Sequence, residues 1–414
     1  TPDGCPMPRK PESVPKAPFI RRIAILLNAR LPSHHTDTQQ VMKNAAALTA
    51  NGLRVTVFVP QRGRYLFRRG STFRRVIHEY YNIPEELDVR GVRALPAGRF
   101  RPEKLTHALL VPFLVLFRRI PILYTREPLA ALLGLLLGRR VIFETYRCLG
   151  DEYPRLIRFM GRFARGRRFL GVITHSRFAA ASFERAGFPA DRLAPFHNGY
   201  APTDMEPVLD RTAARRATGL PPKKFLLVYT GNMQANKGVE ALLDLAAACP
   251  GETFVLVGGT PADLERLGKI ARERHLKNVI FTGMKPVGDV PKYLYAADVL
   301  LVPPTSAPLL LYGRTVLPFK TFLYMAAGRP ILGPDLPDLR EVLTPRSAVL
   351  VTPDDTRAAA KALEKLAGDP ALCKKIGSAS AKAAAGLTWD ERGKRIAGWI
   401  AERYHASLTR SARK

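Results

Sequence analysis

Two lysines lie where an apolar run ends and a helix is expected to begin, and each could bind a phosphate group. Lys237 stands in "NKGV", after the loop that follows "KFLLVYTGN". A cation is electrostatically unfavourable at a helix start, so this placement favours a ligand contact over a surface lysine. Gly238 would let the backbone approach that ligand. Lys320, in "LPFKTF", also begins an expected helix behind Pro318. The alternative for both lysines is a solvated side chain.

Short apolar runs rich in β-branched residues position these lysines. Such runs alternate with helical patterns, which predicts βαβ units and parallel sheets. The first series of expected strands is 21–27, 53–60, 120–125, 139–145 and 169–176, and the second is 224–232, 251–259, 277–283, 297–304 and 329–335. Turn-forming residues at 197–210 separate the series. We therefore expect an α/β fold of two Rossmann-like doubly wound domains facing a central cleft, with ligands at the carboxyl ends of the strands.

Composition narrows the class of protein. The 414 residues are 46% hydrophobic and carry a net charge of +30, which indicates a globular chain that attracts anions. The four cysteines are far apart, so no metal site is expected and a reducing compartment is indicated. The longest apolar runs have about ten residues, short of the roughly 20 needed to span a bilayer. The absence of GxGxxG and GxxxxGK[ST] argues against a dinucleotide dehydrogenase and a P-loop NTPase.

At three segments of the carboxyl half the residues become recognisable: "VYTGNMQANKGVEALLDLA", "VIFTGMKPVGDVPKYLYAADVLLVPP" and "LPFKTFLYMAAGRPILGPDLPDLREVL". They resemble glycosyltransferase family 4, and "NARLPSHHTDTQQVMKNAAALTANGLRVTVFVP", "LYTREPLAALLG" and "VIFETYRC" fall in the expected order in the amino half. The resemblance implies the GT-B fold and a hexosyltransferase that uses a nucleotide diphosphate sugar, retains the anomeric configuration and needs no metal. Cations and helix N-termini would stabilise the leaving diphosphate.

The resemblance also implies a division of the chain. Residues 1–18 are Pro-rich and are expected to be a disordered leader. The acceptor domain would span 19–205 and the donor domain 206–387. A closing helix at 388–405, anchored by Trp389 and Trp399, would cross back to the first domain. Residues 406–414 would form a basic tail.

Several positions of this sequence match the family's donor site. The resemblance assigns donor contacts to Gly231, Asn232, Lys237, Gly238, Gly283, Met284, Thr315 and Lys320. Asn232 stands where the family usually has a second cation, an arginine. Thr315 and Leu323 stand eight apart, where the family usually carries two glutamates, one approaching the sugar and one holding the ribose. Neither side chain can act as a carboxylate would.

The amino half offers candidates for contact with the reacting sugar. Tyr146 falls where relatives often have histidine; it can donate a hydrogen bond but is a poor base near neutral pH. Glu144 and Arg126 lie at strand ends facing the expected cleft. The alternatives are a strand-end Glu144 that pairs with an arginine, and an ion pair between Arg126 and Glu127. His34 and His35, in an expected loop, have no metal partners in register.

A basic amphipathic helix is expected at 155–168, "RLIRFMGRFARGRR". Arg155, Arg158, Arg162 and Arg165 recur at helical spacing beside a face of apolar residues, a pattern typical of helices that lie on anionic membrane. The alternative is a helix whose apolar face packs on the core. Aromatic residues among arginines also suit nucleic acid, but no RRM, OB or helix-turn-helix pattern is present.

Three functions remain open. The first is an active glycosyltransferase, cytoplasmic and peripheral on the inner membrane face, extending a lipid-linked or envelope saccharide. The second is a non-catalytic relative that binds a nucleotide sugar, lipid or partner as a scaffold. The third, a nucleic-acid binder, depends on charge alone. The absent glutamates favour the scaffold, while the retained lysines and glycine turns favour the enzyme. We prefer the enzyme, because drift should not remove the acids and spare the cations at one site.

Overall fold

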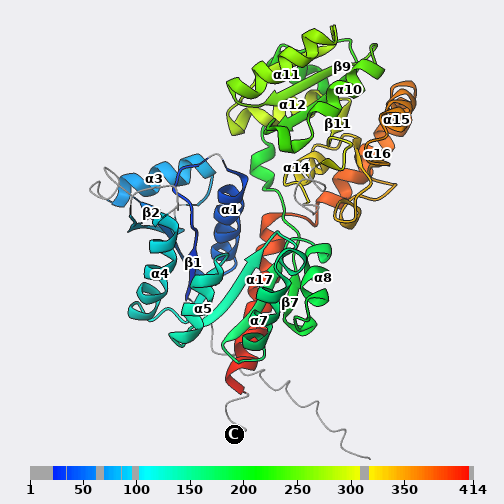
Figure 1. Ribbon diagram of the computed structural model, residues 1–414. Helices are drawn as coiled ribbons and strands as arrows, with labels where there is room; N and C mark the ends of the chain where they lie inside the picture. Colours follow the sequence, from blue (N-terminus) through cyan, green and yellow to red (C-terminus); the bar gives the residue numbers. More distant parts are fainter. Residues whose placement is uncertain are drawn as a thin grey trace, which may run out of the picture.

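The computed structural model of the protein describes residues 22–33, 35–61, 70–84, 86–95, 102–307 and 317–409. These residues form two α/β domains, each built on one parallel sheet with helices on both faces (Figure 1). This arrangement confirms the predicted fold class. The leader at 1–18, His34 and Thr315 lie outside the described residues.

The first domain contains a seven-stranded sheet in the order β3-β2-β1-β4-β5-β6-β7. Its strands are β1 (Arg22–Leu26), β2 (Arg54–Gln61), β3 (Asp88–Arg93), β4 (Ile122–Thr125), β5 (Arg140–Thr145), β6 (Phe169–Thr174) and β7 (Leu193–Pro195). Apolar side chains on both faces of the strands are buried, so Ile23 and its neighbour Ala24 belong to different core clusters. The strand order reverses between β1 and β4, which places the ligand-binding edge where these two strands end.

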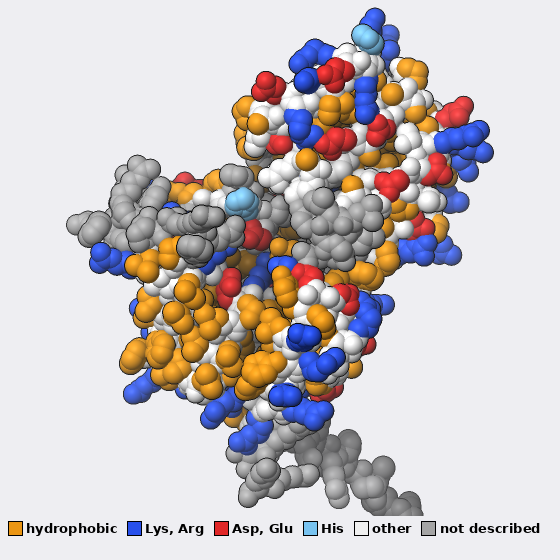
Figure 2. Space-filling view, viewed as in Figure 1, with side chains coloured by type: hydrophobic (Ala, Val, Ile, Leu, Met, Phe, Trp, Pro, Cys, Tyr) orange, Lys and Arg blue, Asp and Glu red, His pale blue; other side chains and the backbone are white. Residues whose placement is uncertain are grey.

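Helices cover both faces of this sheet. They are α1 (Thr36–Ala50), α3 (Gly70–Tyr81), α4 (Pro102–Phe117), α5 (Pro128–Leu136), α6 (Leu149–Glu152), α7 (Pro154–Ala164) and α8 (Arg177–Arg185). Hydrophobic side chains gather on the outer surface over α4, α5 and α7 (Figure 2). None of the helices in the described ranges has both the length and the apolar character that crossing a membrane requires.

The second domain contains a six-stranded sheet in the order β10-β9-β8-β11-β12-β13. Its strands are β8 (Leu226–Gly231), β9 (Thr253–Gly258), β10 (Val279–Gly283), β11 (Val299–Leu301), β12 (Ile331–Pro334) and β13 (Val349–Val351). Its helices are α9 (Arg211–Thr218), α10 (Glu240–Ala248), α11 (Pro261–Glu273), α12 (Val290–Ala296), α14 (Lys320–Ala326), α15 (Thr356–Gly368) and α16 (Pro370–Ala384). Here the order reverses between β8 and β11. The expected domain boundary, 205/206, falls between Pro195 at the end of β7 and Arg211 at the start of α9.

A single long helix, α17 (Trp389–Thr409), returns from the second domain and packs along the first (Figure 1). Gly393 permits a close approach to α1, because a Cβ on it would lie 2.8 Å from the Cβ of Ala47. Trp399 packs against Phe196 and covers Gly171. The helix extends four residues beyond its expected end at 405, so part of the expected tail is helical, and residues 410–414 lie outside the described ranges.

A buried histidine in α4 makes the stability of the first domain sensitive to acid. His107 has 0% exposure, and within the described part of the chain neither of its ring nitrogens has a hydrogen-bond partner. Burial lowers its pKa from 6.5 to about 4. The folded protein therefore keeps the imidazole neutral while the unfolded chain protonates it, and the free energy of unfolding falls as the pH drops from about 6.5 towards about 4. Between about pH 7.5 and about pH 5, the free energy of unfolding should fall by about 2 kcal/mol less in His107→Leu than in the parent protein.

Urea unfolding at both pH values measures this difference, with His405→Leu on the exposed surface of α17 as the matched control. An unchanged pH dependence in His107→Leu would contradict the prediction.

Candidate functional site

The chain turns sharply after β8, just before Lys237. Gly231 ends the strand with φ of 131°, and Gly238 follows a short 3-10 helix, η3 (Ala235–Lys237), with φ of 67°. Both values lie in the region that favours glycine, so the turn depends on these two residues. The hydroxyl of Tyr229 donates a hydrogen bond of 2.5 Å to the backbone oxygen of Asn232 and ties the turn to the strand. Lys237 is exposed at the end of η3.

Lys320, the first residue of α14, lies beside the same turn. It follows β11 in the chain, across the point between β8 and β11 where the strand order reverses (the switch point of the second sheet). Its Nζ lies 3.5 Å from the centroid of the Tyr229 ring, and a Cβ on Gly231 would lie 3.1 Å from that nitrogen. Burial and the nearby charge of Lys237 hold the pKa of Lys320 well below its ordinary value. Across the described residues, no carboxylate forms an ion pair with either lysine. The two amines therefore lie near each other at this turn without a paired carboxylate among the described residues.

The other donor-site candidates lie along the same sheet edge or on α14. Gly283 ends β10 with φ of 70°, and Met284 beside it is 57% exposed, but β9 separates this strand from β8. Leu323 is half-buried and packs on the core of the second domain. Its aliphatic side chain carries no charge that could bind a ribose. The predicted contacts of Asn232, Gly283, Met284 and Thr315 with a donor stay predictions.

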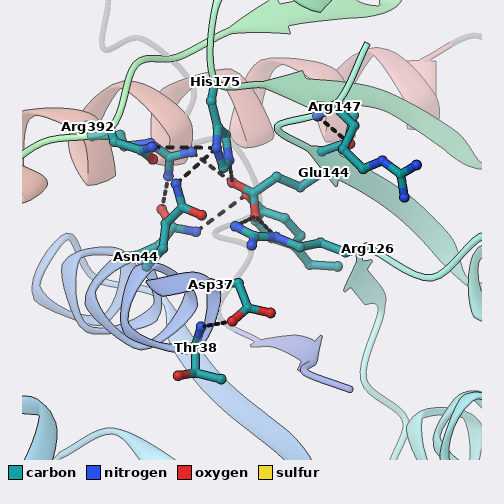
Figure 3. Close-up of polar contacts among 12 residues, drawn as sticks. Asp37, Thr38, Asn44, Arg126, Glu144, Arg147, His175 and Arg392 are labelled. Atoms are coloured by element: carbon teal, nitrogen blue, oxygen red, sulfur yellow. Dashed lines mark hydrogen bonds and ion pairs between the residues drawn. The ribbon is translucent and has the colours of Figure 1, made fainter. Parts of the chain in front are cut away.

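A buried polar network occupies the facing edge of the first domain (Figure 3). Glu144 at the end of β5 accepts two hydrogen bonds, of 3.1 and 3.0 Å, from Arg126 and one of 2.8 Å from Arg392 on α17. Arg392 also donates to the side-chain oxygen of Asn44 on α1. These contacts join α1, two strand ends and the returning helix at one carboxylate.

His175, directly after β6, completes this network. Its Nε2 lies 2.9 Å from Glu144 Oε1, and its Nδ1 lies 2.9 Å from the amide nitrogen of Gln40. The amide donates to Nδ1, so the ring carries its proton on Nε2 and donates it to Glu144. Burial lowers the pKa of His175 to about 4, which keeps the ring neutral. Burial alone would raise the pKa of Glu144, but Arg126, His175 and Arg392 outweigh it and hold that pKa well below its ordinary value.

The side chain of Glu144 is 3% exposed, and both of its oxygens accept hydrogen bonds from neighbouring residues. A direct role of Glu144 in catalysis stays a prediction. The open alternative, a strand-end glutamate paired with an arginine, describes these contacts. Arg126 pairs with Glu144 and not with Glu127.

Two predicted residues of this edge are only partly covered. The side chain of Arg126 is 18% exposed, and its Nη1 is a buried atom with no hydrogen-bond partner among the described residues. Tyr146 is 37% exposed, and its ring centroid lies 6.1 Å from that of His175. Contact of Arg126 or Tyr146 with a substrate stays a prediction.

Besides α17, a carboxylate of the second domain contacts the first domain. Glu341, in the short helix η5 (Leu339–Glu341) of the second domain, accepts hydrogen bonds from the backbone N–H groups of Arg177 and Phe178, at 2.7 and 2.8 Å. These N–H groups begin α8 of the first domain, so the carboxylate caps a helix of the other domain. His197 lies 2.7 Å from the same carboxylate. Burial alone would raise the pKa of Glu341. The hydrogen bonds from His197 and the two amides outweigh burial, so the pKa of Glu341 lies below its ordinary value.

Sequence reasoning did not identify several residues of these sites. His175 lies at a strand end, a position that could have marked it, as it marked Glu144 and Arg126. Arg392 and Glu341 gave no such signal, because their partners are far away in the chain. The expected membrane arginines Arg155, Arg158, Arg162 and Arg165 are all exposed on or beside α7. The described residues contain no group of three His, Cys, Asp or Glu that could hold a metal ion.

The chain is similar to known proteins both in sequence and in fold. Residues 224–369, which include both lysines, match the family model of glycosyl transferases group 1. The structure of Anabaena Alr3699/HepE in complex with UDP superposes with a TM-score of 0.70 at 17% identity, covering 92% of this chain and all of that one. The fold is GT-B. WaaG, a glycosyltransferase involved in lipopolysaccharide biosynthesis, superposes with a TM-score of 0.65 at 15% identity over 91% of this chain and 99% of its own.

Curated sequence relatives are glycosyltransferases by name. A D-inositol 3-phosphate glycosyltransferase of Streptomyces bingchenggensis is 27% identical over 230 residues, which are 52% of this chain and 49% of the relative. The chain thus spans about half the length of this curated relative. The family match and this relative support a transferase of the glycosyltransferase class, while the solved structures show the fold.

Proposed function

We propose that the protein transfers a sugar from a nucleoside diphosphate sugar to a lipid-linked or envelope saccharide, with retention at the anomeric carbon and without a metal. The observation that carries this proposal is the convergence of Lys237 and Lys320 on the end of β8, at the switch point of the second sheet. Two amines at one strand end, with no paired carboxylate among the described residues, suit a diphosphate, which carries more than one negative charge.

The two amines would act mainly on the leaving group. As the bond between sugar and diphosphate breaks, negative charge grows on the phosphate oxygens, and fixed cations stabilise it more than they stabilise the bound sugar nucleotide. Lys320 contributes most when desolvated, because its charge is then poorly screened. HepE, a GT-B neighbour, has been solved with UDP and with UDP-glucose, which supports a uridine nucleotide as the first donor to test.

Three parts of the proposal go further than the fold. Retention of configuration comes from the resemblance to glycosyltransferase family 4. Arg126 and Tyr146 would contact the acceptor or the reacting sugar from the opposite edge. The inner face of the cytoplasmic membrane is the proposed location, since Arg155, Arg158, Arg162 and Arg165 are exposed where anionic lipid could meet them.

A second candidate function is a GT-B scaffold that binds a nucleotide sugar or membrane without turnover. The half-buried Leu323 favours it, because a leucine stands where the family usually has a carboxylate for the ribose. The scaffold would bind nucleotide and leave the donor intact, so the two functions differ in the release of free UDP.

Calorimetry with UDP, GDP and ADP tests the proposal. We expect micromolar binding of one nucleotide and at least about a hundredfold weaker binding in the Lys237→Ala, Lys320→Ala double variant, since two charge-assisted contacts are removed. Lys269→Ala on the exposed face of α11 is the matched control. A folded protein with no nucleotide affinity would exclude the enzyme, and binding without UDP release from any donor with membrane extract would favour the scaffold.

A further inference from the structure

Three neighbouring helices of the first domain present an unusually apolar surface. More than half of the large hydrophobic side chains that are exposed in the described residues lie on α4, α5 and α7. We call this surface the apolar face, defined by Leu105, Leu109, Leu110, Phe113, Phe117, Leu129, Leu136, Leu156 and Phe159. Phe117 is 78% exposed and Leu136 is 68% exposed. Figure 2 shows hydrophobic side chains gathered over these helices. Patches of this kind mark interaction sites in soluble proteins.

A groove opens within the apolar face between α5 and α7. It has a volume of about 210 Å³, and all ten side chains that line it are apolar. Leu132 and Leu135 form one wall, Phe159 and Phe163 the other, and Phe169 of β6 lies among the lining residues. Nothing in this lining could hydrogen-bond a sugar, a base or a phosphate, so the groove suits a hydrocarbon occupant.

Basic side chains border the apolar face. Arg118 and Arg119 follow α4, while Arg155, Arg158 and Arg162 project from α7, and all five are exposed. Three more exposed arginines follow α7 at 165, 167 and 168. The segment 154–168 contains no acidic residue, so these charges are not neutralised within their own helix. A hydrophobic surface bordered by arginines has the chemistry of a helix face lying in an anionic lipid headgroup layer.

We propose that the apolar face docks on an anionic phospholipid bilayer and that the groove between α5 and α7 takes up a phospholipid acyl chain. The bordering arginines would bind the headgroup phosphates while Phe117, Leu136 and Phe159 enter the acyl boundary. A second copy of the chain fits less well, because pairing this face with itself would bring two sets of arginines together. The docking rests on the membrane location in the proposed function and deepens it by naming the surface and its occupant, but it does not require the protein to be an active transferase.

Docking of this face would also orient the first domain. Pro128 and Leu129, which begin α5 and line the groove, follow Arg126 by two and three positions. One end of the groove therefore lies next to the strand edge that carries Arg126.

Flotation of the full chain with vesicles tests the docking. The vesicles contain phosphatidylcholine alone or with about 30 mol% phosphatidylglycerol, at low and at physiological salt. We expect the protein to float with the anionic vesicles and not with the neutral ones, with binding that weakens at higher salt. Phe117→Asp, and separately the Arg158→Glu, Arg162→Glu pair, should each weaken binding by about tenfold or more.

Matched controls carry the same changes on the second domain. Val287→Asp replaces an exposed apolar side chain there, and Arg272→Glu reverses an exposed charge on α11. Both should float as the unaltered protein does. Leu132→Trp fills the groove and should reduce the phospholipid that co-purifies with the protein, measured by native mass spectrometry, while its circular dichroism stays unchanged.

Three outcomes would overturn the proposal. They are equal flotation with neutral and anionic vesicles, unchanged flotation of both Phe117→Asp and the arginine pair, and a dimer in light scattering that Phe117→Asp dissolves. UDP binding by the same variants separates this inference from the proposed function. Loss of flotation with intact UDP binding concerns the lipid surface alone, and flotation without UDP binding concerns the donor site alone.

Discussion

Lys320→Met is expected to abolish most activity and at the same time to make the protein more stable. Removing a cation aimed at the leaving diphosphate should lower kcat/KM by about a hundred- to a thousandfold, the cost typical of losing one electrostatic contact in a transition state. The free energy of unfolding should rise by about 1 kcal/mol, because the cation is desolvated and lies near the like charge of Lys237. Methionine keeps the apolar stem over the ring of Tyr229.

The pH dependence follows from the same lowered pKa. The folded protein releases the proton of Lys320 at a lower pH than the unfolded chain does, so charged Lys320 reduces stability at low pH and this penalty disappears as the pH rises through the folded pKa towards 10.5. A bound diphosphate favours the charged amine. Nucleotide binding should therefore take up protons at any pH where the free protein holds Lys320 partly neutral, and Lys320→Met should abolish this uptake.

Initial-rate kinetics, thermal unfolding and calorimetry in buffers of different ionisation enthalpy measure the three effects. Lys292→Met serves as control, since Lys292 pairs with Asp289 on the surface of the same domain. Lys320→Arg should recover part of the activity. A variant that is inactive and also less stable than the parent would indicate a structural role for Lys320, and an active variant would remove it from the donor site.

The sheets could be predicted because parallel strands buried on both faces read as continuous apolar runs. In β5 five of the six residues are buried, and in β6 all six are. The strand β3 was missed because its sequence, "DVRGVR", has only Val89 and Val92 buried and carries charges between them. β7 and β13 were missed because each has three residues of which only one is buried, whereas β11, equally short, is buried throughout and lies within a longer apolar run.

The sheet edge of the second domain could be predicted further than that of the first domain. Lys237 and Lys320 follow β8 and β11, the two strands that flank the switch point, so topology alone brings them to one edge. The environment of Glu144 depends on Arg392, which is 248 positions away on α17. No local pattern encodes such a pairing, so the sequence left a catalytic and a structural glutamate equally possible.

Through α17 the network around Glu144 is connected to the donor domain. Trp389, at the start of the helix, stacks on Phe319 with ring centroids 5.8 Å apart, and Phe319 directly precedes Lys320. One turn further, Arg392 binds Glu144 and Asn44 in the first domain. The same helix thus contacts Phe319, the residue beside Lys320, and the carboxylate of Glu144, which pairs with Arg126. The first turn of α17 therefore links the two domains.

Arg392→Met should for this reason destabilise the protein by about 3–5 kcal/mol, as expected when one partner of a buried ion pair is removed. The variant leaves Glu144 with less compensation in a buried site and leaves the side-chain oxygen of Asn44 without its donor. Lys394→Met, an exposed change on the same helix, should alter the free energy of unfolding by less than about 0.5 kcal/mol. Urea unfolding provides both values.

A double-mutant cycle separates a specific pairing from a general loss of packing. In an Arg392→Met background, Glu144→Gln removes the uncompensated charge, so it should cost less than in the parent, with a coupling of about 1–3 kcal/mol. The stability that depends on Glu144 should be present near neutral pH and fall in acid, because the carboxyl has a lowered pKa in the folded protein and must be protonated against its partners. Additive effects in the cycle would mean that Arg392 stabilises α17 by its methylene stem alone, and Glu144 would then depend on Arg126 and His175.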